Sequence, residues 1–412
     1  MTSGKFYKKS MNDVHVVGKT VLVRADYNVP LTKDGHVADD YRIRMSVPTI
    51  QALLKDNCKV VIISHLGRPE GKPNPAFSLE PVALRLAELL HEPVRFVDQC
   101  TGPKVKMAVK RAPNRSVTVL ENLRFHEGEE ANEPEFAKQL ATDSGAELFI
   151  QDGFGVVQRA HASTSAITQD LPSVAGLLLE REYMTITEAM KHPKRPLVAV
   201  LGGAKVSDKI GVIKALVHVA DTIIVGGATA NTFLARGGLF VGDSKVETDQ
   251  FSVIDDIHEA VIKKVGRTRL DSFLVLPVDV GVGTSMATTA TRRDVSVKSI
   301  PAGSLALDIG PQSTALMDTI VARAHTVIWN GTLGYAEVPA FAAASSSLAE
   351  TLVKRHDEVT SIIGGGDTAD FVIKWDKKHG ASFSHVSTGG GASLELMAGE
   401  KLPGIEALLD AR

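Results

Sequence analysis

The chain has 412 residues, 44% of them hydrophobic and 23% charged, a composition typical of a soluble globular protein and long enough for two domains. Its formal net charge of −2 provides no bulk field that would attract nucleic acid or an anionic membrane, so we expect neither as a partner. Only two cysteines occur, Cys58 and Cys100, and no long apolar run is present. We therefore expect a cytoplasmic protein with structural thiols and no membrane span.

Short apolar runs alternate with helix-like stretches in the first part of the chain. The runs begin at Val21, Val60, Val117 and Leu148. The helix-like stretches include residues 47–55, 79–90 and 134–144. Such alternation predicts βαβ units with a parallel sheet, and the nearly continuous apolar character of the runs indicates strands covered by helices on both faces.

Polar and cationic residues follow these four runs and are candidates for an anion site. Ligands of open α/β sheets bind outside the carboxyl ends of the strands, and guanidinium groups bind phosphate and carboxylate bidentately. The candidates are Asp26, Asn28, Arg42, His65, Arg68, Arg124 and Arg159. A single arginine is usually a surface or ion-pair residue, but a set at one sheet edge indicates a small polyanion. The sequence leaves two roles open for His65, phosphate donor or structural residue. It also leaves two roles open for Asp26 and Asn28: they either accept hydrogen bonds from a substrate hydroxyl or orient the arginines.

A charged, amphipathic stretch runs from Glu180 to His192 and is followed by Pro193 and Pro196. Because proline ends a helix, we expect a helix that stops here. We place the boundary at this helix, with one domain at residues 1–180, a hinge helix at 181–196 and a second domain at 197–399. An ordinary surface helix is the alternative.

Glycine clusters follow the apolar runs of the second part, which begin at Leu197, Ile223, Ser361 and His385. Lys205 and Lys209 follow the first cluster, without Walker spacing, and lie four residues apart, as on one helix face. A second cluster contains Gly365 and Gly366 and precedes Asp367 and Thr368, which combines close backbone approach with a hard oxygen ligand for Mg²⁺. A third cluster, Gly389, Gly390 and Gly391, offers amides at a helix N-terminus.

A tight turn explains any one glycine cluster, but three clusters at three strand exits indicate a site for nucleotide phosphates. One part of the chain thus offers cationic side chains to a small anion, and the other offers backbone amides to phosphates. The pair suggests phosphate transfer between a small anion and a nucleotide.

Several long motifs resemble those of the phosphoglycerate kinase family, in the same order and over nearly the whole chain. They are RADYNVP at 24–30, SHLGRP at 64–69, LENLRF at 120–125, RAHAS at 159–163, LGGAKVSDK at 201–209, GP at 310–311, WNG at 329–331, GGGDT at 364–368 and HVSTGGGASLE at 385–395. Around these motifs, the sequence departs from the family's usual residues at Ala25, Tyr27, Gly153, Gln158, Thr332, Tyr335 and Ala336. None of these departures removes a charged candidate.

The resemblance implies a monomer of two Rossmann-like domains, each a parallel sheet flanked by helices. It implies reversible transfer of the acyl phosphate of 1,3-bisphosphoglycerate to ADP with Mg²⁺, giving 3-phosphoglycerate and ATP. The cationic set would hold 3-phosphoglycerate, and a tail at residues 400–412 would pack back on the first domain. The nucleotide residues implied are Lys205, Lys209, Gly310, Asn330, Glu337, Gly365, Gly366, Asp367 and Thr368. Among these, Glu337 would meet the ribose and Asp367 the metal.

The reaction that the resemblance implies has a carboxylate as its acceptor or leaving group, so it needs no general base and depends on positioning and charge neutralisation. We expect Arg42, Lys205 and the amides of Gly389 to Gly391 to stabilise the transferring phosphoryl group, with the domains closing around it. Two alternatives are a different carboxylate kinase and a catalytically inactive nucleotide-binding scaffold. The presence of Arg42, Lys205 and Asp367 argues against the scaffold.

Overall fold

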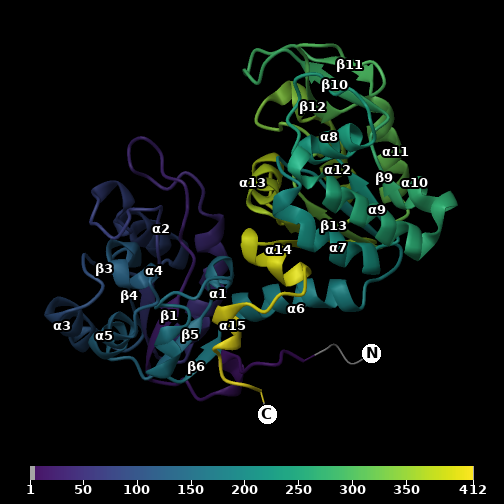
Figure 1. Cartoon of the computed structure of the whole chain (residues 1–412). Helices are drawn as coiled ribbons and strands as arrows, with labels where there is room; N and C mark the ends of the chain where they lie inside the picture. Colours follow the sequence, from purple (N-terminus) through teal and green to yellow (C-terminus); the bar gives the residue numbers. More distant parts are fainter. Residues whose placement is uncertain (1–4, 412) are drawn as a thin grey trace. The chain divides into compact units, whose positions relative to one another are not determined.

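The computed structural model describes residues 5–411, so residues 1–4 and 412, which the predicted domain and tail ranges include, lie outside the described residues. The chain forms two compact units (Figure 1). The first extends to Met184 and includes the C-terminal segment from Lys401, and the second is Thr185–Glu400. The long helix α6 (Leu177–Lys191) therefore has residues in both units.

The first unit contains a parallel sheet in the order β3-β4-β2-β1-β5-β6. Its strands are β1 (Thr20–Arg24), β2 (Lys59–Ile63), β3 (Val94–Val97), β4 (Ser116–Leu120), β5 (Leu148–Gln151) and β6 (Ser173–Ala175). Its helices include α1 (Tyr41–Lys55), α2 (Glu80–Leu90), α3 (Pro103–Arg111), α4 (Glu127–Glu130), α5 (Pro134–Ser144) and α15 (Pro403–Glu406).

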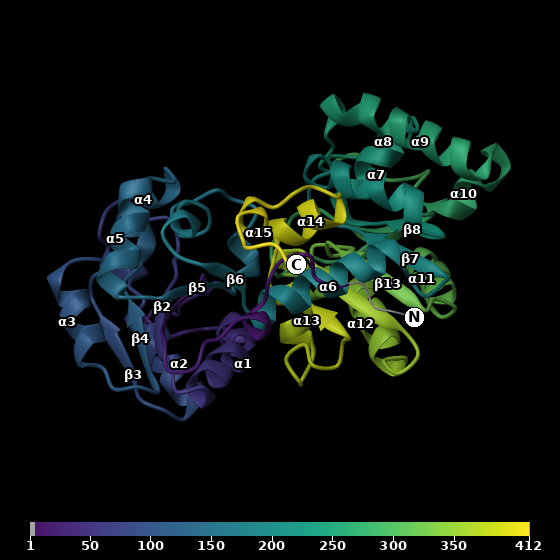
Figure 2. The same cartoon turned by 90° about the horizontal axis from the view of Figure 1, so that it is seen from below.

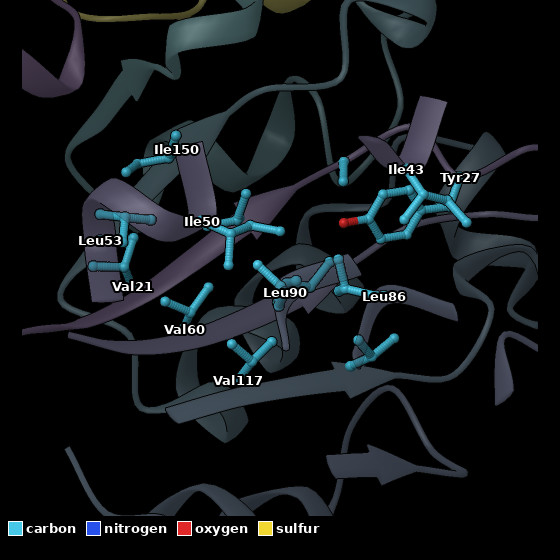
Figure 3. Close-up of a cluster of buried hydrophobic side chains, with 14 of the residues drawn as sticks. Val21, Tyr27, Ile43, Ile50, Leu53, Val60, Leu86, Leu90, Val117 and Ile150 are labelled. Atoms are coloured by element: carbon cyan, nitrogen blue, oxygen red, sulfur yellow. The ribbon is translucent and has the colours of Figure 1, made fainter. Parts of the chain in front are cut away.

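Alternate residues of each strand supply two separate cores, one on each face of this sheet. Val21 of β1 packs with side chains of α1 and α2, whereas Leu22 packs with side chains of α3 and α5. Figure 3 shows the first core, where Val21, Val60 and Val117 of neighbouring strands lie near Leu53 and Leu86 of the covering helices. Each such side chain stabilises the fold by about 1.5–3 kcal/mol through burial, so the cores hold the strand ends in place.

The second unit contains another parallel sheet, in the order β15-β14-β13-β7-β8-β9. Its strands are β7 (Leu197–Leu201), β8 (Thr222–Val225), β9 (Leu274–Val275), β13 (Thr326–Asn330), β14 (Thr360–Gly364) and β15 (His385–Val386). Its helices are α7 (Ile210–Val219), α8 (Gly227–Arg236), α9 (Phe251–Val265), α10 (Leu270–Phe273), α11 (Pro311–Val321), α12 (Ala343–Lys354), α13 (Gly366–Trp375) and α14 (Gly391–Met397). The predicted fold class, two parallel sheets flanked by helices, is confirmed.

A small antiparallel sheet in the second unit was not predicted. It consists of β10 (Asp279–Gly283), β11 (Arg293–Ser296) and β12 (Leu305–Ile309), in the order β11-β10-β12. It has a core of its own, in which Val280 and Val282 pack with Leu234 of α8. Glycine occupies alternate positions of β10, at Gly281 and Gly283, so the run lacks the apolar character that identified the other strands.

The segments near the two chain ends pair with each other and with the edge strand β6, through the bridges Lys8–Asp410 and Ser10–Ala175. Figure 2 shows the C-terminal segment with α15 beside β6. The Lys9 amide donates to the Leu409 carbonyl, and the Leu409 amide donates to the Ser173 carbonyl of β6. The buried Lys8 ammonium donates to the carbonyl oxygens of Glu406 and Leu408 at 2.8 and 3.0 Å. The C-terminal segment is thus anchored within the first unit. Within residues 5–411, no helix has the length and apolar character that crossing a membrane requires.

Candidate active site

The cationic candidates of the first unit come from loops at the carboxyl ends of the strands. The β1 residue Arg24 lies in register with Ile63 of β2 and Gln151 of β5, so these three strand ends are level. Three strands are followed by candidates: β1 by Asp26 and Asn28, β2 by His65 and Arg68, and β5 by Arg159. The other two lie in helices, Arg42 in the first turn of α1 and Arg124 in the 3-10 helix Leu123–Phe125. The sequence therefore places these residues at the edge where open α/β sheets bind ligands.

Hydrogen bonds connect several of these candidates. Arg42 Nη1 donates to Asp26 Oδ2 at 2.6 Å, and the Asn28 amide donates to Asp26 Oδ1 at 3.1 Å. The Gly67 amide donates to Asn28 Oδ1 at 2.9 Å, and Arg124 Nη1 donates to the Gly67 carbonyl at 2.8 Å. Asp26 and Asn28 thus bond to the other site residues, an arrangement that orients Arg42 and the loop of Gly67.

The electrostatic environment shows that the cationic residues share one neighbourhood. Burial lowers the pKa of His65 well below its usual value, and the charges of four arginines lower it further, in descending order Arg24, Arg124, Arg42 and Arg159. His65 and Arg124 are buried, whereas Arg68 and Arg159 are exposed. His65 is therefore neutral, and the guanidinium groups of Arg68 and Arg159 are accessible to solvent. Such a site attracts an anion.

Sequence reasoning missed a buried network beneath this site. Arg24, 1% exposed, donates from Nε to Ser163 Oγ at 2.8 Å. The fully buried Glu129 accepts from the Ser163 amide at 3.0 Å and from Ser163 Oγ at 2.6 Å. Glu129 Oε1 also lies 3.8 Å from Arg24 Nη2. The only signal in the sequence was a charged residue at the end of an apolar strand, which is unusual for a buried position.

In the second unit, two of the glycines allow loops at the sheet edge to touch each other. A Cβ atom added to Gly202, after β7, would overlap the Thr332 carbonyl oxygen. A Cβ atom added to Gly331, after β13, would overlap the backbone of Gly202. These glycines therefore have a packing reason that needs no ligand. Gly366 differs, because no atom of the described residues lies within 4 Å of its Cβ position, apart from its chain neighbours and its own helix backbone.

The two candidate lysines occupy different environments. Lys205 is exposed, whereas Lys209 is 8% exposed and its Nζ donates to Asn330 Oδ1 at 2.6 Å. The expectation that both lie on one helix face was wrong, because α7 begins only at Ile210 and Lys205 precedes the 3-10 helix Ser207–Lys209. The buried Asn330 Nδ2 has no hydrogen-bond partner within residues 5–411, so a donor remains available beside Lys209.

Glu247 fixes the loop between these lysines and was also missed from the sequence. Its carboxylate accepts from the Val206 amide, from the Ser207 amide at 3.3 Å and from Ser207 Oγ at 2.6 Å. Glu247 lies 40 positions from Ser207 along the chain, and no local pattern could have connected the two.

Two helix N-termini lie close together at the glycine-rich edge. Gly366 begins α13 and Gly391 begins α14, and the Cβ position of Gly390 lies 4.0 Å from the Gly366 amide nitrogen. Among the three predicted amides of this cluster, that of Gly389 is already engaged, since it donates to Ser387 Oγ at 3.0 Å. Because a helix N-terminus carries a partial positive charge, two of them close together suit phosphate oxygens.

Asp367 and Thr368 follow Gly366 in α13 and have different surroundings. Thr368 is buried, and its Oγ1 accepts from the Gly331 amide at 2.6 Å. Asp367 is exposed, and its charge acts on Lys209. Within the described part of the chain, no group of three or more acidic, histidine or cysteine residues could hold a metal ion. A single exposed carboxylate nevertheless suits Mg²⁺, which typically takes one or two carboxylates together with substrate phosphates.

Gly310 and Glu337 complete the predicted nucleotide set. Gly310 immediately precedes α11, its amide donates to the Asp279 carbonyl at 2.8 Å, and an added Cβ atom would overlap the Asp279 carboxylate. Glu337 is exposed in the segment after β13. Both residues belong to the second unit, like the other predicted nucleotide residues.

Comparisons with known proteins agree with this architecture. A family model described as phosphoglycerate kinase matches residues 11–400. The phosphoglycerate kinase of Rubrobacter xylanophilus is 45% identical over 401 residues, covering 97% of this chain and 98% of that protein, and that of Chloroflexus aggregans is 44% identical over 407 residues, covering 98% and 99%. The phosphoglycerate kinase structure from Coxiella burnetii, 34% identical, has a TM-score of 0.81 and covers 97% of this chain and 98% of that chain. The chain therefore belongs to the phosphoglycerate kinase family.

Proposed function

We propose that the chain is a glycolytic kinase that transfers the acyl phosphate of 1,3-bisphosphoglycerate to ADP, giving 3-phosphoglycerate and ATP, reversibly. The observation that carries this proposal is the contrast between the two sheet edges. One collects four arginines around a neutral histidine, and the other brings the N-termini of α13 and α14 close together. A polyanionic metabolite fits the first, and nucleotide phosphates fit the second.

In the first unit, the seven cationic and polar candidates hold 3-phosphoglycerate. The exposed Arg68 and Arg159 are free to close on the phosphate or carboxylate, while the buried Arg124 is fixed by its bond to the Gly67 carbonyl. Asp26 orients Arg42 through the 2.6 Å ion pair. This division supports binding by a preformed, buried part of the site together with two exposed arginines.

In the second unit, Lys205, Lys209, Gly310, Asn330, Glu337, Gly365, Gly366, Asp367 and Thr368 surround the nucleotide. Thr368 and Glu247 act indirectly, because they hold the Gly331 and Lys205 loops. Asp367 would hold Mg²⁺, which supplies charge neutralisation to the nucleotide phosphates when bound. Among the amides of the last cluster, those of Gly390 and Gly391 are the better candidates, since the Gly389 amide already has a partner.

The chemistry depends on positioning, because the accepting carboxylate is ionised at neutral pH and loses no proton. Arg42 and Lys205 neutralise charge on the transferring phosphoryl group, each contributing about 3 kcal/mol to the transition state. We expect the enzyme to work as a cytoplasmic monomer in which α6 acts as the hinge for closure of the two units. In-line transfer then proceeds directly from donor to acceptor.

The test is a coupled assay with 3-phosphoglycerate, ATP and Mg²⁺. Arg42→Ala and Lys205→Ala should each reduce kcat at least about a hundredfold, with the circular dichroism spectrum unchanged. Lys138→Ala on α5 and Lys263→Ala on α9 remove exposed cations elsewhere and should retain full turnover. A wild-type protein that binds nucleotide without turnover would contradict the proposed function. Normal turnover in both site variants would contradict the assigned roles.

A further inference from the structure

A contact between two buried side chains determines which proton His65 carries. Arg24 lies at the end of β1 and His65 follows β2, and the two are 1% and 3% exposed. Arg24 Nη2 lies 3.3 Å from His65 Nδ1. A guanidinium group has donors only and stays protonated in proteins, so Nδ1 must be the acceptor in this bond. The neutral ring then carries its proton on Nε2.

The guanidinium group of Arg24 is held on every side, so it cannot turn away from His65. Its Nε donates to Ser163 Oγ at 2.8 Å, and its Nη1 donates to the Ala25 carbonyl. Nη1 also lies 3.5 Å from Ser64 Oγ. The carboxylate of Glu129 fixes Ser163 through two bonds and lies 3.8 Å from Nη2. This buried carboxylate compensates the Arg24 charge within the fold, which marks Arg24 as a framework residue rather than a ligand contact.

Two further observations define what His65 presents to a ligand. Among the described residues, the ring nitrogen of His65 that takes part in a hydrogen bond is Nδ1, which leaves Nε2 for a ligand. Burial and four neighbouring arginines disfavour the cationic ring, so the single N–H on Nε2 persists across neutral pH. A ring with its only proton on Nε2 donates to an acceptor oxygen and cannot act as a base at that atom.

We propose that Arg24 is a positioning residue that fixes His65 as the Nε2–H tautomer, so that His65 is a one-way donor to an anionic oxygen of the small substrate. Its effect on specificity rests on the proposed function of the site. A ligand with a carboxylate or phosphate oxygen at this point accepts the bond, whereas a ligand with a donor group there meets an N–H and is rejected. Arg24 thereby acts on the substrate without touching it.

Nitrogen NMR of the imidazole rings tests the tautomer directly and needs no catalysis. The His65 signals are assigned by their loss in His65→Gln. In the free wild-type protein at pH 7, we expect a pyridine-type shift at Nδ1 and a pyrrole-type shift at Nε2. A pyrrole-type Nδ1, or two equivalent protonated nitrogens, would overturn the proposal without any variant being made.

Variants separate the donor from the network around it. Arg24→Lys keeps the positive charge next to Glu129 but loses the planar guanidinium group and its fixed N–H donors. The double variant Arg24→Gln with Glu129→Gln removes both charges together. We expect mixed tautomers in both and a KM for 3-phosphoglycerate raised about tenfold, as for one misdirected hydrogen bond, with KM for ATP unchanged. Glu129→Gln alone retains the Arg24 donor and should keep the Nε2–H tautomer.

The outcomes distinguish this proposal from the proposed function. If the wild type shows the Nε2–H tautomer but no kinase activity, the function fails and the role of Arg24 as a tautomer lock stands. If the wild type is active and the Arg24 variants keep both the tautomer and KM, the positioning role is refuted. A general loss of structure would change the KM for both substrates and lower kcat. It would also broaden the signals of all the imidazole rings, not those of His65 alone.

Discussion

Under the proposed function, the two sheet edges of this molecule bind phosphate by opposite means. In the first unit, the groups that face the ligand are long side chains supported by a buried framework of Arg24, Glu129 and Ser163. In the second unit, the groups that face the ligand include backbone amides at helix N-termini, and side chains such as Thr368 and Glu247 position the loops. In a site made of exposed side chains, a charged group can be replaced with little loss of fold stability. In a site made of backbone amides, the loops keep their positions only while the glycines allow them to pack.

The largest effect should come from filling a glycine contact in the second unit. Gly202→Ala places a methyl group against the Thr332 carbonyl oxygen and should lower the free energy of unfolding by about 3 kcal/mol. Urea unfolding followed by circular dichroism measures this loss. Gly366→Ala is the matched control, because its Cβ position is open and its φ is not in the left-handed region. It should retain stability, and equal losses in the two variants would refute the packing explanation.

The next effect is a pH dependence of the free energy of unfolding, and it comes from Asp152, a buried carboxylate of the first unit outside the candidate site. Burial raises the pKa of Asp152 to about 7 from 3.8, although nearby polar groups oppose the rise, the Thr49 hydroxyl first and then the Leu178 and Leu179 amides. Oδ1 accepts from the Leu178 amide in α6 at 2.9 Å, and Oδ2 has no hydrogen-bond partner among the described residues. The folded state binds this proton more tightly than the unfolded state between pH 4 and 7. Its contribution to stability is therefore complete below the unfolded pKa and is lost as pH rises through 7.

Asp152→Asn keeps the acceptor for Leu178 and removes the buried charge. The variant should be about 3 kcal/mol more stable than the wild type at pH 8 and no more stable at pH 4. Urea midpoints measured across this range provide the comparison, and Asp170→Asn, near β6, is a control for a carboxylate that is not buried. A constant difference at all pH values would contradict the assigned titration.

The smallest effect concerns the orientation of Arg42. Asp26→Asn keeps the acceptor for the Asn28 amide but replaces the ion pair with Arg42 by an unfavourable amide contact. We expect stability to fall by about 1 kcal/mol, and the KM for 3-phosphoglycerate to rise several-fold while that for ATP is unchanged. Steady-state kinetics with each substrate varied in turn measure the two constants. A rise in both would indicate a general disturbance instead of a local one.

Much of the fold was predictable because its strands are strongly apolar and its helices end at clear signals. Pro193 and Pro196 marked the end of α6, which stops at Lys191. The antiparallel sheet escaped prediction, since the glycines of β10 and the exposed residues of β11 do not have the pattern of buried strands. Strand order and strand-end register are tertiary properties that no local pattern encodes.

The charged residues of the candidate site could be named from strand exits, but their internal connections could not. Arg24 and Ser163 are 139 positions apart, and Lys209 and Asn330 are 121 apart. Their pairing results from packing of distant segments, as does the buried position of Glu129. The helix-face argument for Lys205 failed because the chain first makes a 3-10 turn, Ser207–Lys209.

The most direct test of the account is calorimetric titration of two ligands into two variants. Arg42→Ala should weaken 3-phosphoglycerate binding at least about tenfold and leave Mg²⁺–ADP binding unchanged, and Lys205→Ala should do the reverse. This result would show that the first unit binds the small anion through side chains and that the second binds the nucleotide. If Arg42→Ala weakened nucleotide binding and left 3-phosphoglycerate binding intact, the division of the two sites between the units would be wrong.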